Sequence, residues 1–219
     1  MADPAESGGA GVLSRREEIL DAATDLFAEH GFTETVTQTL ADRLQVGKGT
    51  IYRHFPSKQA LFLAAADRVM RRLRARIDGE IEGIVDPLDR LSRAVHAFLA
   101  FFDEHPKFAE LLIQERAQFK DRTKPTYVEH REVNVLRWRE LYRGLVADGR
   151  VRDIPVERIS DVIGDLSYGT IFTNYFAGRR KPSGAQAQDI LDVVFFGILS
   201  DTERQKRRDE PGRPVVKGG

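Results

Sequence analysis

The sequence contains no cysteine among its 219 residues. Disulfide bonds and thiolate metal sites are therefore excluded, and a chain of this kind fits a reducing compartment. Long apolar runs are also missing: none approaches the 18 or more residues that a membrane-spanning helix needs, and the first residues show no signal-peptide pattern. We therefore expect a cytoplasmic protein without a membrane span.

Motifs for catalysis or metal binding are equally scarce. The five histidines form no His-x-x-x-His pair, and the chain has neither a nucleophile-elbow motif nor a glycine-rich phosphate loop. The sequence thus predicts no catalytic residue, no metal site and no cofactor. An enzyme built on a helical bundle, with a site made from histidines and carboxylates, is kept as an alternative.

The chain as a whole has no excess of charge of either sign, since 34 Lys and Arg balance 34 Asp and Glu. The distribution of charge is more informative than its sum. Between Arg43 and Lys58 every charged side chain is positive, whereas acidic residues gather in the segment before it. This local patch favours binding to nucleic acid, although charge alone would not identify it.

Apolar residues recur at helical spacing along most of the chain, and no convincing strand pattern is present. We predict an all-α protein of nine helices, in which a three-helix helix-turn-helix domain precedes a six-helix bundle for ligand binding and dimerisation. The expected ranges are a disordered tail at 1–12, the DNA-binding domain at 13–57, the effector-binding and dimerisation domain at 58–202, and a flexible tail at 203–219.

Residues 37–55 predict two short helices joined by a tight turn. The first helix carries one apolar stripe, formed by Leu40, Ala41 and Leu44. In the second helix Ile51 and Phe55 are four residues apart and share one face. Gly47 is placed to cap the second helix, although Ser, Thr, Asn or Asp would cap it better.

The face of the second helix opposite to Ile51 and Phe55 has Arg53 at its centre. An arginine there can donate two hydrogen bonds to a guanine edge, while flanking polar groups hold phosphates. A solvated helix face is the alternative. The predicted DNA-binding residues are Thr37, Gln38, Lys48, Gly49, Thr50, Tyr52, Arg53, His54 and Lys58.

These residues resemble the DNA-binding region of the TetR/AcrR family of bacterial transcriptional regulators. The resemblance is carried by Gly31-Phe32, Thr35, Leu40-Ala41, the run from Gly49 to Phe55, and Lys58 with Leu61-Phe62. The chain departs from the family in having Gln45 where the turn usually has glycine and Gly47 where the cap is usually serine. The first motif helix could be capped by Thr35 or by Thr37.

The resemblance implies a DNA-binding regulator, most simply a repressor that a small apolar ligand releases from a palindromic operator. A helical ligand-binding or scaffold protein that lacks DNA binding is the second alternative.

Near the C-terminal end, residues 190–199 form a stretch that is apolar on all sides of a helix. Such a helix needs cover on every side, which its own bundle and a partner subunit would provide. We therefore predict a homodimer through the last two helices; the alternative is a core helix in a monomer. The predicted interface residues are Ile190, Val193, Val194, Phe195 and Phe196.

The C-terminal region is also rich in aromatic residues, with polar groups among them. This composition suits a pocket for a small apolar effector, although each ring could equally belong to the core. The predicted pocket residues are Phe98, Phe102, Glu115, Phe119, Trp138, Tyr142, Tyr168 and Phe172.

Overall fold

The computed structural model describes residues 14–35, 37–178, 181–198, 200–202 and 205. Within these residues the chain forms nine helices and no strand, as the sequence predicts: α1 (Arg15–Glu34), α2 (Thr37–Arg43), α3 (Lys48–His54), α4 (Lys58–Ile81), α5 (Pro87–Glu104), α6 (Pro106–Gln118), α7 (Thr126–Ala147), α8 (Val156–Ala177) and α9 (Ser183–Phe196). Apart from Gln205, the two tails predicted at 1–12 and 203–219 lie outside the described residues.

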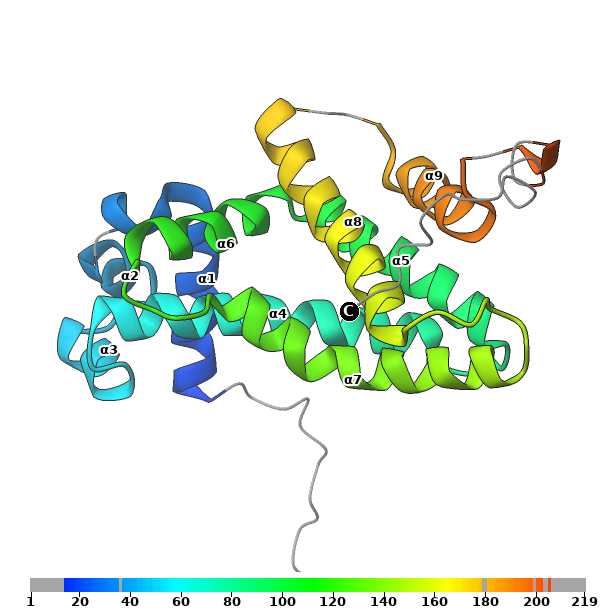
Figure 1. The fold of residues 1–219 in the computed structure, drawn as a ribbon. Helices are drawn as coiled ribbons and strands as arrows, with labels where there is room; N and C mark the ends of the chain where they lie inside the picture. Colours follow the sequence, from blue (N-terminus) through cyan, green and yellow to red (C-terminus); the bar gives the residue numbers. More distant parts are fainter. Residues whose placement is uncertain (1–13, 36, 179–180, 199, 203–204, 206–219) are drawn as a thin grey trace, which may run out of the picture.

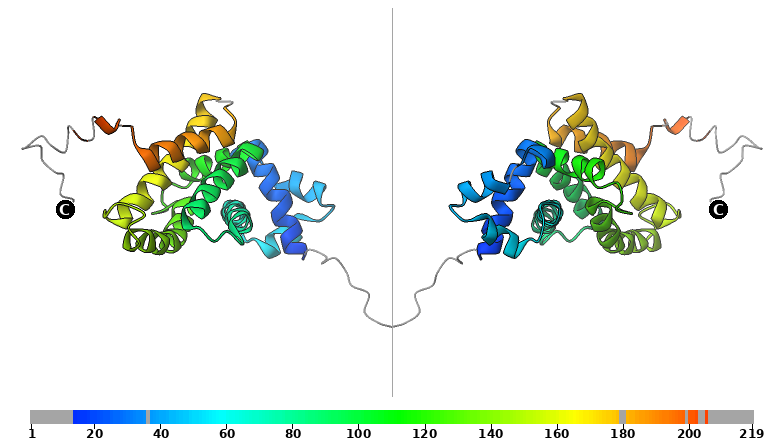
Figure 2. Two further views of the ribbon diagram at one scale, coloured as in Figure 1. Left: turned by 90° about the vertical axis from the view of Figure 1, so that its right-hand side faces the viewer. Right: turned by 90° about the vertical axis from the view of Figure 1, so that its left-hand side faces the viewer.

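Helix α4 is the long element that joins the two ends of the molecule (Figure 1). It packs against α1 in the small N-terminal group and against α5 and α7 in the bundle. Helix α8 packs on α7 and α5, and α9 lies on α5. The side views in Figure 2 show α1–α3 at one end of the molecule and α9 toward the other.

Three helices begin where the sequence places a capping side chain. Ser14, Ser57 and Asp86 precede α1, α4 and α5, and the side-chain oxygen of each accepts a hydrogen bond from a backbone N–H of the first turn. Such a bond satisfies one of the N–H groups that have no partner within the helix. Local sequence therefore sets these boundaries.

Two helix ends differ from the positions that the sequence predicts: Gly31 predicts the end of the first helix, and the last helix is predicted to run to about Ser200. Helix α1 does not stop at Gly31: the chain kinks there, with φ at 74°, and continues for another turn to Glu34. Thr35 then ends α1, with its buried hydroxyl donating to the Gly31 carbonyl at 2.6 Å, and α2 begins at Thr37. Helix α9 ends at Phe196, before the predicted Ser200, because Gly197 takes a positive φ of 72°.

One hydrophobic core runs through both ends of the molecule. Where the two ends meet, the rings of Phe27 and Phe62 in the core pack against the partly buried rings of Phe32 and Phe119, with neighbouring centroids 5.0–6.3 Å apart. These rings come from α1, α4 and the end of α6. The predicted domain boundary after residue 57 therefore divides segments that share one core, and it stays a prediction.

Candidate DNA interface and ligand cavity

Helices α2 and α3 are held to the core by the apolar residues that the sequence singles out. Leu40, Ala41, Ile51 and Phe55 are all buried. Because α3 is only two turns long, burial of Ile51 and Phe55 fixes which way the rest of the helix points. The opposite face is thereby turned to solvent.

The solvent-facing side of α3 carries Lys48, Gly49, Tyr52 and Arg53, all exposed. In the described part of the chain no hydrogen bond or ion pair involves the side chain of Lys48 or Arg53. Around Gly49 an added Cβ would meet no atom within 4 Å, so this chain itself does not require a glycine there. Thr50 and His54 are half-buried at the edges of the same face.

Helix α2 contributes to this surface through Thr37. Its hydroxyl lies 3.2 Å from the Tyr52 hydroxyl, which joins the start of α2 to the outer side of α3. The exposed Gln38 donates instead to Asp42 within α2 at 2.5 Å. The structure thus brings Thr37 together with the α3 residues and gives the amide of Gln38 a partner of its own.

Lys58 has a structural contact that the sequence did not predict. Its ammonium donates to the Thr33 carbonyl at 3.1 Å and lies 4.6 Å from the centre of the Phe32 ring. These contacts fasten the start of α4 to the last turn of α1. The predicted phosphate contact of Lys58 stays a prediction, and it would have to share the ammonium with Thr33.

The bundle contains a cavity of about 130 Å³ between α4, α5, α7 and α8. Four of the predicted pocket residues line it: Phe98, Trp138, Tyr142 and Tyr168. The sequence analysis missed three polar residues of α7 in the lining, Arg131, Asn134 and Arg137. Arg131, Asn134, Trp138 and Tyr142 follow one another at intervals of three or four residues, and this spacing is the signal that places them on one helix face.

The other four predicted pocket residues are not part of this lining. Phe102 packs against Phe98 and Phe101 within α5, and Phe119 belongs to the aromatic cluster at the end of α6. Phe172 packs against Tyr127. In this structure these rings pack against other aromatic side chains, as the alternative reading expects, and their role as ligand contacts stays a prediction.

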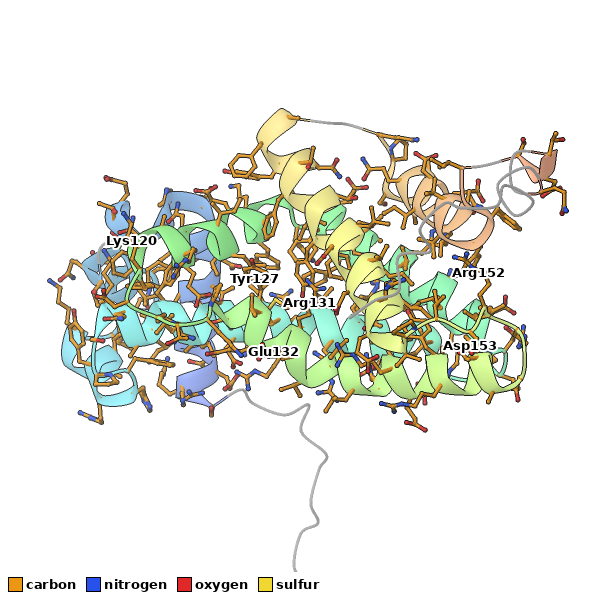
Figure 3. The ribbon with its side chains drawn as sticks, viewed as in Figure 1. Lys120, Tyr127, Arg131, Glu132, Arg152 and Asp153 are labelled. Atoms are coloured by element: carbon orange, nitrogen blue, oxygen red, sulfur yellow. The ribbon has the colours of Figure 1, made fainter. Side chains whose placement is uncertain are left out.

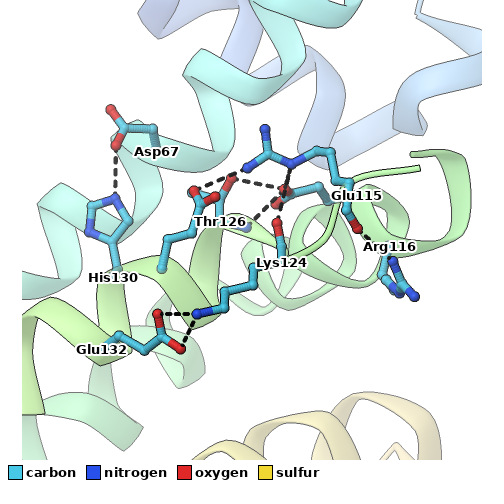
Figure 4. Close-up of polar contacts among 9 residues, drawn as sticks. Asp67, Glu115, Arg116, Lys124, Thr126, His130 and Glu132 are labelled. Atoms are coloured by element: carbon cyan, nitrogen blue, oxygen red, sulfur yellow. Dashed lines mark hydrogen bonds and ion pairs between the residues drawn. The ribbon is translucent and has the colours of Figure 1, made fainter. Parts of the chain in front are cut away.

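Glu115 is the fourth residue outside the lining, with an exposed fraction of 1%. Its Oε1 accepts from the backbone N–H of Thr126 at 2.8 Å and from the hydroxyl of Thr126 at 2.9 Å, and Arg122 Nε lies 3.3 Å away (Figure 4). Burial raises the pKa of this carboxyl, although these bonds and Arg122 oppose the shift. Glu115 therefore joins the end of α6 to the start of α7.

The predicted interface residues of α9 divide between two environments. Ile190 and Val194 are half-buried against the bundle, whereas Val193, Phe195 and Phe196 are exposed. Helix α8 adds exposed apolar side chains that the sequence analysis did not name: Val162, Leu166, Tyr175 and Phe176. Val162 and Leu166 are four residues apart and therefore lie on one face of this neighbouring helix.

Comparison with known proteins identifies the family. Residues 19–65 match the model of bacterial regulatory proteins of the tetR family, and residues 84–167 match a tetracyclin repressor-like C-terminal domain. Together the two matches span more than half of the chain. No helix in the described ranges is long and apolar enough to cross a bilayer.

Individual relatives agree with these matches. The HTH-type transcriptional repressor KstR2 of Mycobacterium tuberculosis is 27% identical over 195 residues, which cover 87% of this chain and 96% of that protein. The nucleoid occlusion factor SlmA of Vibrio campbellii is 27% identical over 167 residues, 73% of this chain and 85% of that protein.

Solved structures show the same fold. The transcriptional regulator FadR of Bacillus subtilis, in complex with stearoyl-CoA, aligns with a TM-score of 0.72 at 16% identity and covers 84% of this chain and all of that one. The ketosteroid regulator KstR2 of Mycobacterium tuberculosis aligns at 0.62 and 23% identity, over 87% and 98% of the two chains. This chain therefore belongs to the tetR family of bacterial regulatory proteins and is a DNA-binding transcriptional regulator rather than an enzyme.

Proposed function

We propose that this regulator is a repressor that binds a palindromic operator as a homodimer and leaves it when a small apolar ligand enters the bundle. One observation carries the proposal: α4 is both a wall of the cavity and the support of the DNA-reading end. Met70, Leu73 and Ile77 of α4 line the cavity. Two to three turns earlier, Leu61 and Phe62 are buried in the core shared with α1.

One structural observation favours a dimer, and the geometry of a dimer in turn favours a palindromic operator. The exposed apolar residues of α8 and α9 form a surface of the kind that subunits cover in each other. A two-fold dimer presents two reading helices, and each would occupy one half-site.

The size of the cavity suggests how binding would change the protein. A volume of about 130 Å³ is well below the roughly 300–1,000 Å³ of typical ligand pockets. A ligand of ordinary size would therefore bind best to a wider bundle in which α4 has moved. A shift of α4 would change the distance between the two α3 helices that read DNA in the dimer.

The free-energy difference that a ligand must supply to release the operator is modest. A ligand moves such an equilibrium only by its difference in affinity for the two shapes. A hundredfold loss of operator affinity needs a difference of about 2.7 kcal/mol.

The ligands of the structural relatives support an apolar effector. The FadR structure holds stearoyl-CoA, and KstR2 is described as a ketosteroid regulator. Both names refer to molecules with a large apolar body, which suits a cavity whose α5 wall is entirely apolar.

The reading face is tested by operator binding of Arg53→Ala. The operator would first be located by footprinting the DNA beside the gene. We expect a loss of about 1–3 kcal/mol in binding and a relaxed preference at one base pair, because the guanidinium would no longer pair with a base edge. Fluorescence anisotropy on the operator and on single-base variants measures both effects.

Arg90→Ala is the matched control, since Arg90 is exposed on α5, distant from α3 in sequence, and its side chain makes no hydrogen bond or ion pair with the described residues. It should bind like the unaltered protein. Unchanged affinity and selectivity of Arg53→Ala would show that the reading face is assigned wrongly.

Release by a ligand is tested with compounds that raise the melting temperature of the protein. Lipophilic and aromatic compounds would be screened by thermal shift, and operator affinity measured with each compound that stabilises the protein. We expect some of them to weaken operator binding. If compounds that bind in the cavity never change operator affinity, the release mechanism is rejected while the DNA-binding function stands.

A further inference from the structure

The cavity in the bundle has charge of one sign on its walls. Its lining includes the guanidinium residues Arg74, Arg131 and Arg137, and no aspartate or glutamate. Two of these arginines come from α7 and one from α4. A cavity with this lining favours a ligand that carries negative charge.

The carboxylates that pair with these arginines stand outside the lining. Arg137 and Arg74 both pair with one residue, Asp78, whose side chain is exposed. Because two arginines share one carboxylate, this side of the cavity keeps a net positive charge.

Arg131, by contrast, has a carboxylate partner that it does not share with Arg74 or Arg137. Arg131 is a residue of α7 (Figure 3). Its guanidinium pairs with Asp165 of α8 at 2.6 Å. The charge of Arg131 is thereby balanced by a carboxylate outside the lining. The excess positive charge therefore lies at the end of the cavity formed by Arg74 and Arg137.

Two polar atoms on residues of the lining are buried without a partner. Arg137 Nε is a donor and Asn134 Oδ1 is an acceptor, and neither makes a hydrogen bond within the part of the chain that the structure describes. Buried polar atoms are nearly always satisfied in folded proteins, so an unpartnered pair beside a cavity points to a ligand or solvent partner. A donor on a guanidinium bonds most strongly to an anionic oxygen.

Two tyrosines add hydroxyl groups to the lining. Burial raises the pKa of Tyr142 and of Tyr168, so both hydroxyls stay protonated at physiological pH. Neither forms a hydrogen bond with the described residues. Both can therefore act as neutral donors to a ligand oxygen.

Apart from Ser160 and Ser167 of α8, whose hydroxyls donate to backbone carbonyls of their own helix, the rest of the lining is apolar and comes mainly from α4 and α5. All four lining residues of α5 are hydrophobic: Leu91, Ala94, Val95 and Phe98. The cavity is thus amphipathic, with an apolar wall and a cationic, donor-rich side on α7.

From this lining we infer that the effector is an amphiphile with an anionic head group, bound at Arg137 and Asn134, and an apolar body that lies against α4 and α5. The inference rests on the proposed release mechanism and specifies its ligand. A carboxylate of a free acid and a phosphate of an acyl thioester share the required chemistry.

The test compares matched ligands that differ in the head group. Octanoate, 1-octanol and octanoyl-CoA would be titrated into the full-length protein by calorimetry. We expect octanoate or octanoyl-CoA to bind about tenfold more tightly than 1-octanol, because a charge-assisted hydrogen bond replaces a neutral one. Preference for octanoate would identify a free acid, and preference for octanoyl-CoA a thioester.

Arg137→Met tests the head-group site directly. Methionine keeps an unbranched side chain but removes the charge and the Nε donor, so the preference for the anion over 1-octanol should disappear. Asp78→Asn is the matched control, because it breaks the same ion pair and leaves the guanidinium in place. This variant should keep or increase the preference.

Three results would overturn the inference: equal or tighter binding of 1-octanol, no binding of either anion, or an unchanged preference in Arg137→Met. Failure of the release mechanism looks different. In that case the anion binds through Arg137, yet operator affinity stays the same when the ligand is added.

Discussion

Gln45 holds the turn between α2 and α3 in a left-handed backbone conformation, with φ at 52°. Among the described residues it is the single non-glycine residue with a positive φ. The turn needs this conformation because Val46 N–H reaches back to the Ala41 carbonyl at 3.0 Å and closes the end of α2. A side chain makes the left-handed region unfavourable, so glycine would suit this position better than glutamine.

Gln45→Gly should therefore raise the free energy of unfolding by about 0.5–1 kcal/mol, since the gain from relieved strain exceeds the larger entropy that glycine loses on folding. Urea unfolding followed by circular dichroism measures the change.

Gln45→Val provides the opposite case, because a β-branched side chain tolerates a positive φ least. It should lower the free energy of unfolding. A Gln45→Gly protein less stable than the original would mean that the Gln45 side chain contributes more than its backbone strain costs.

At the scale of the elements, α6 connects the bundle to the DNA-reading end. Gln114 of α6 accepts a hydrogen bond from the Phe32 backbone N–H at 2.6 Å, and its amide nitrogen donates to Glu110. The contact is close: a Cβ on Gly31 would lie 2.3 Å from Gln114 Nε2. The kink of α1 at Gly31 thus exposes a backbone N–H that α6 satisfies.

Gln114→Leu should destabilise the protein by about 1–3 kcal/mol, because the partly buried Phe32 N–H loses its acceptor. For a chain of this length, each kcal/mol lowers the melting temperature by about 2–4 °C. Thermal unfolding measures the shift.

Gln118→Leu is the control on the same helix. Gln118 is exposed, and among the described residues its side chain makes one hydrogen bond, a long one of 3.5 Å from its amide nitrogen to the Thr33 hydroxyl. The control should unfold near the original temperature. Equal melting temperatures for both variants would exclude Gln114 as the link between α6 and α1.

At the scale of the whole molecule, α8 and α9 leave large apolar side chains without cover. Phe176 is 71% exposed and Phe196 is 67% exposed. Large apolar side chains exposed in this way favour an interface with a partner. The DNA-reading helices α2 and α3 lie at the far end of the molecule from α9 (Figure 2). Two subunits that pair through α8 and α9 would therefore both keep these helices free to reach DNA.

Phe196→Asp should convert the dimer to a monomer and weaken operator binding with it, because a charge would be buried at the contact and a lone subunit reads one half-site. Sedimentation at micromolar concentration gives the oligomeric state, and anisotropy gives operator affinity.

Val85→Asp is the control, since Val85 is 92% exposed in the loop between α4 and α5. It should sediment and bind DNA like the unaltered protein. A purely monomeric original protein, or a Phe196→Asp protein that still pairs, would reject this interface.

The sequence by itself determined where several helices begin and which side of α3 packs against the core. Caps such as Ser14, Ser57 and Asp86 act within one turn, and the apolar spacing of Ile51 and Phe55 fixes which side of α3 meets the core. These signals are local, so no knowledge of the rest of the fold is needed to interpret them. The same holds for the all-α class, which follows from helical spacing along most of the chain.

The tertiary structure alone decided which side chains meet in the cavity and at the α1–α6 contact. Phe119 and Tyr168 are both aromatic residues of the bundle region, yet one packs against α1 and α4 while the other lines the cavity. Lys58 likewise binds Thr33 because the kink at Gly31 brings that carbonyl to it. Such contacts depend on how distant helices pack, and composition and periodicity carry no information about that packing.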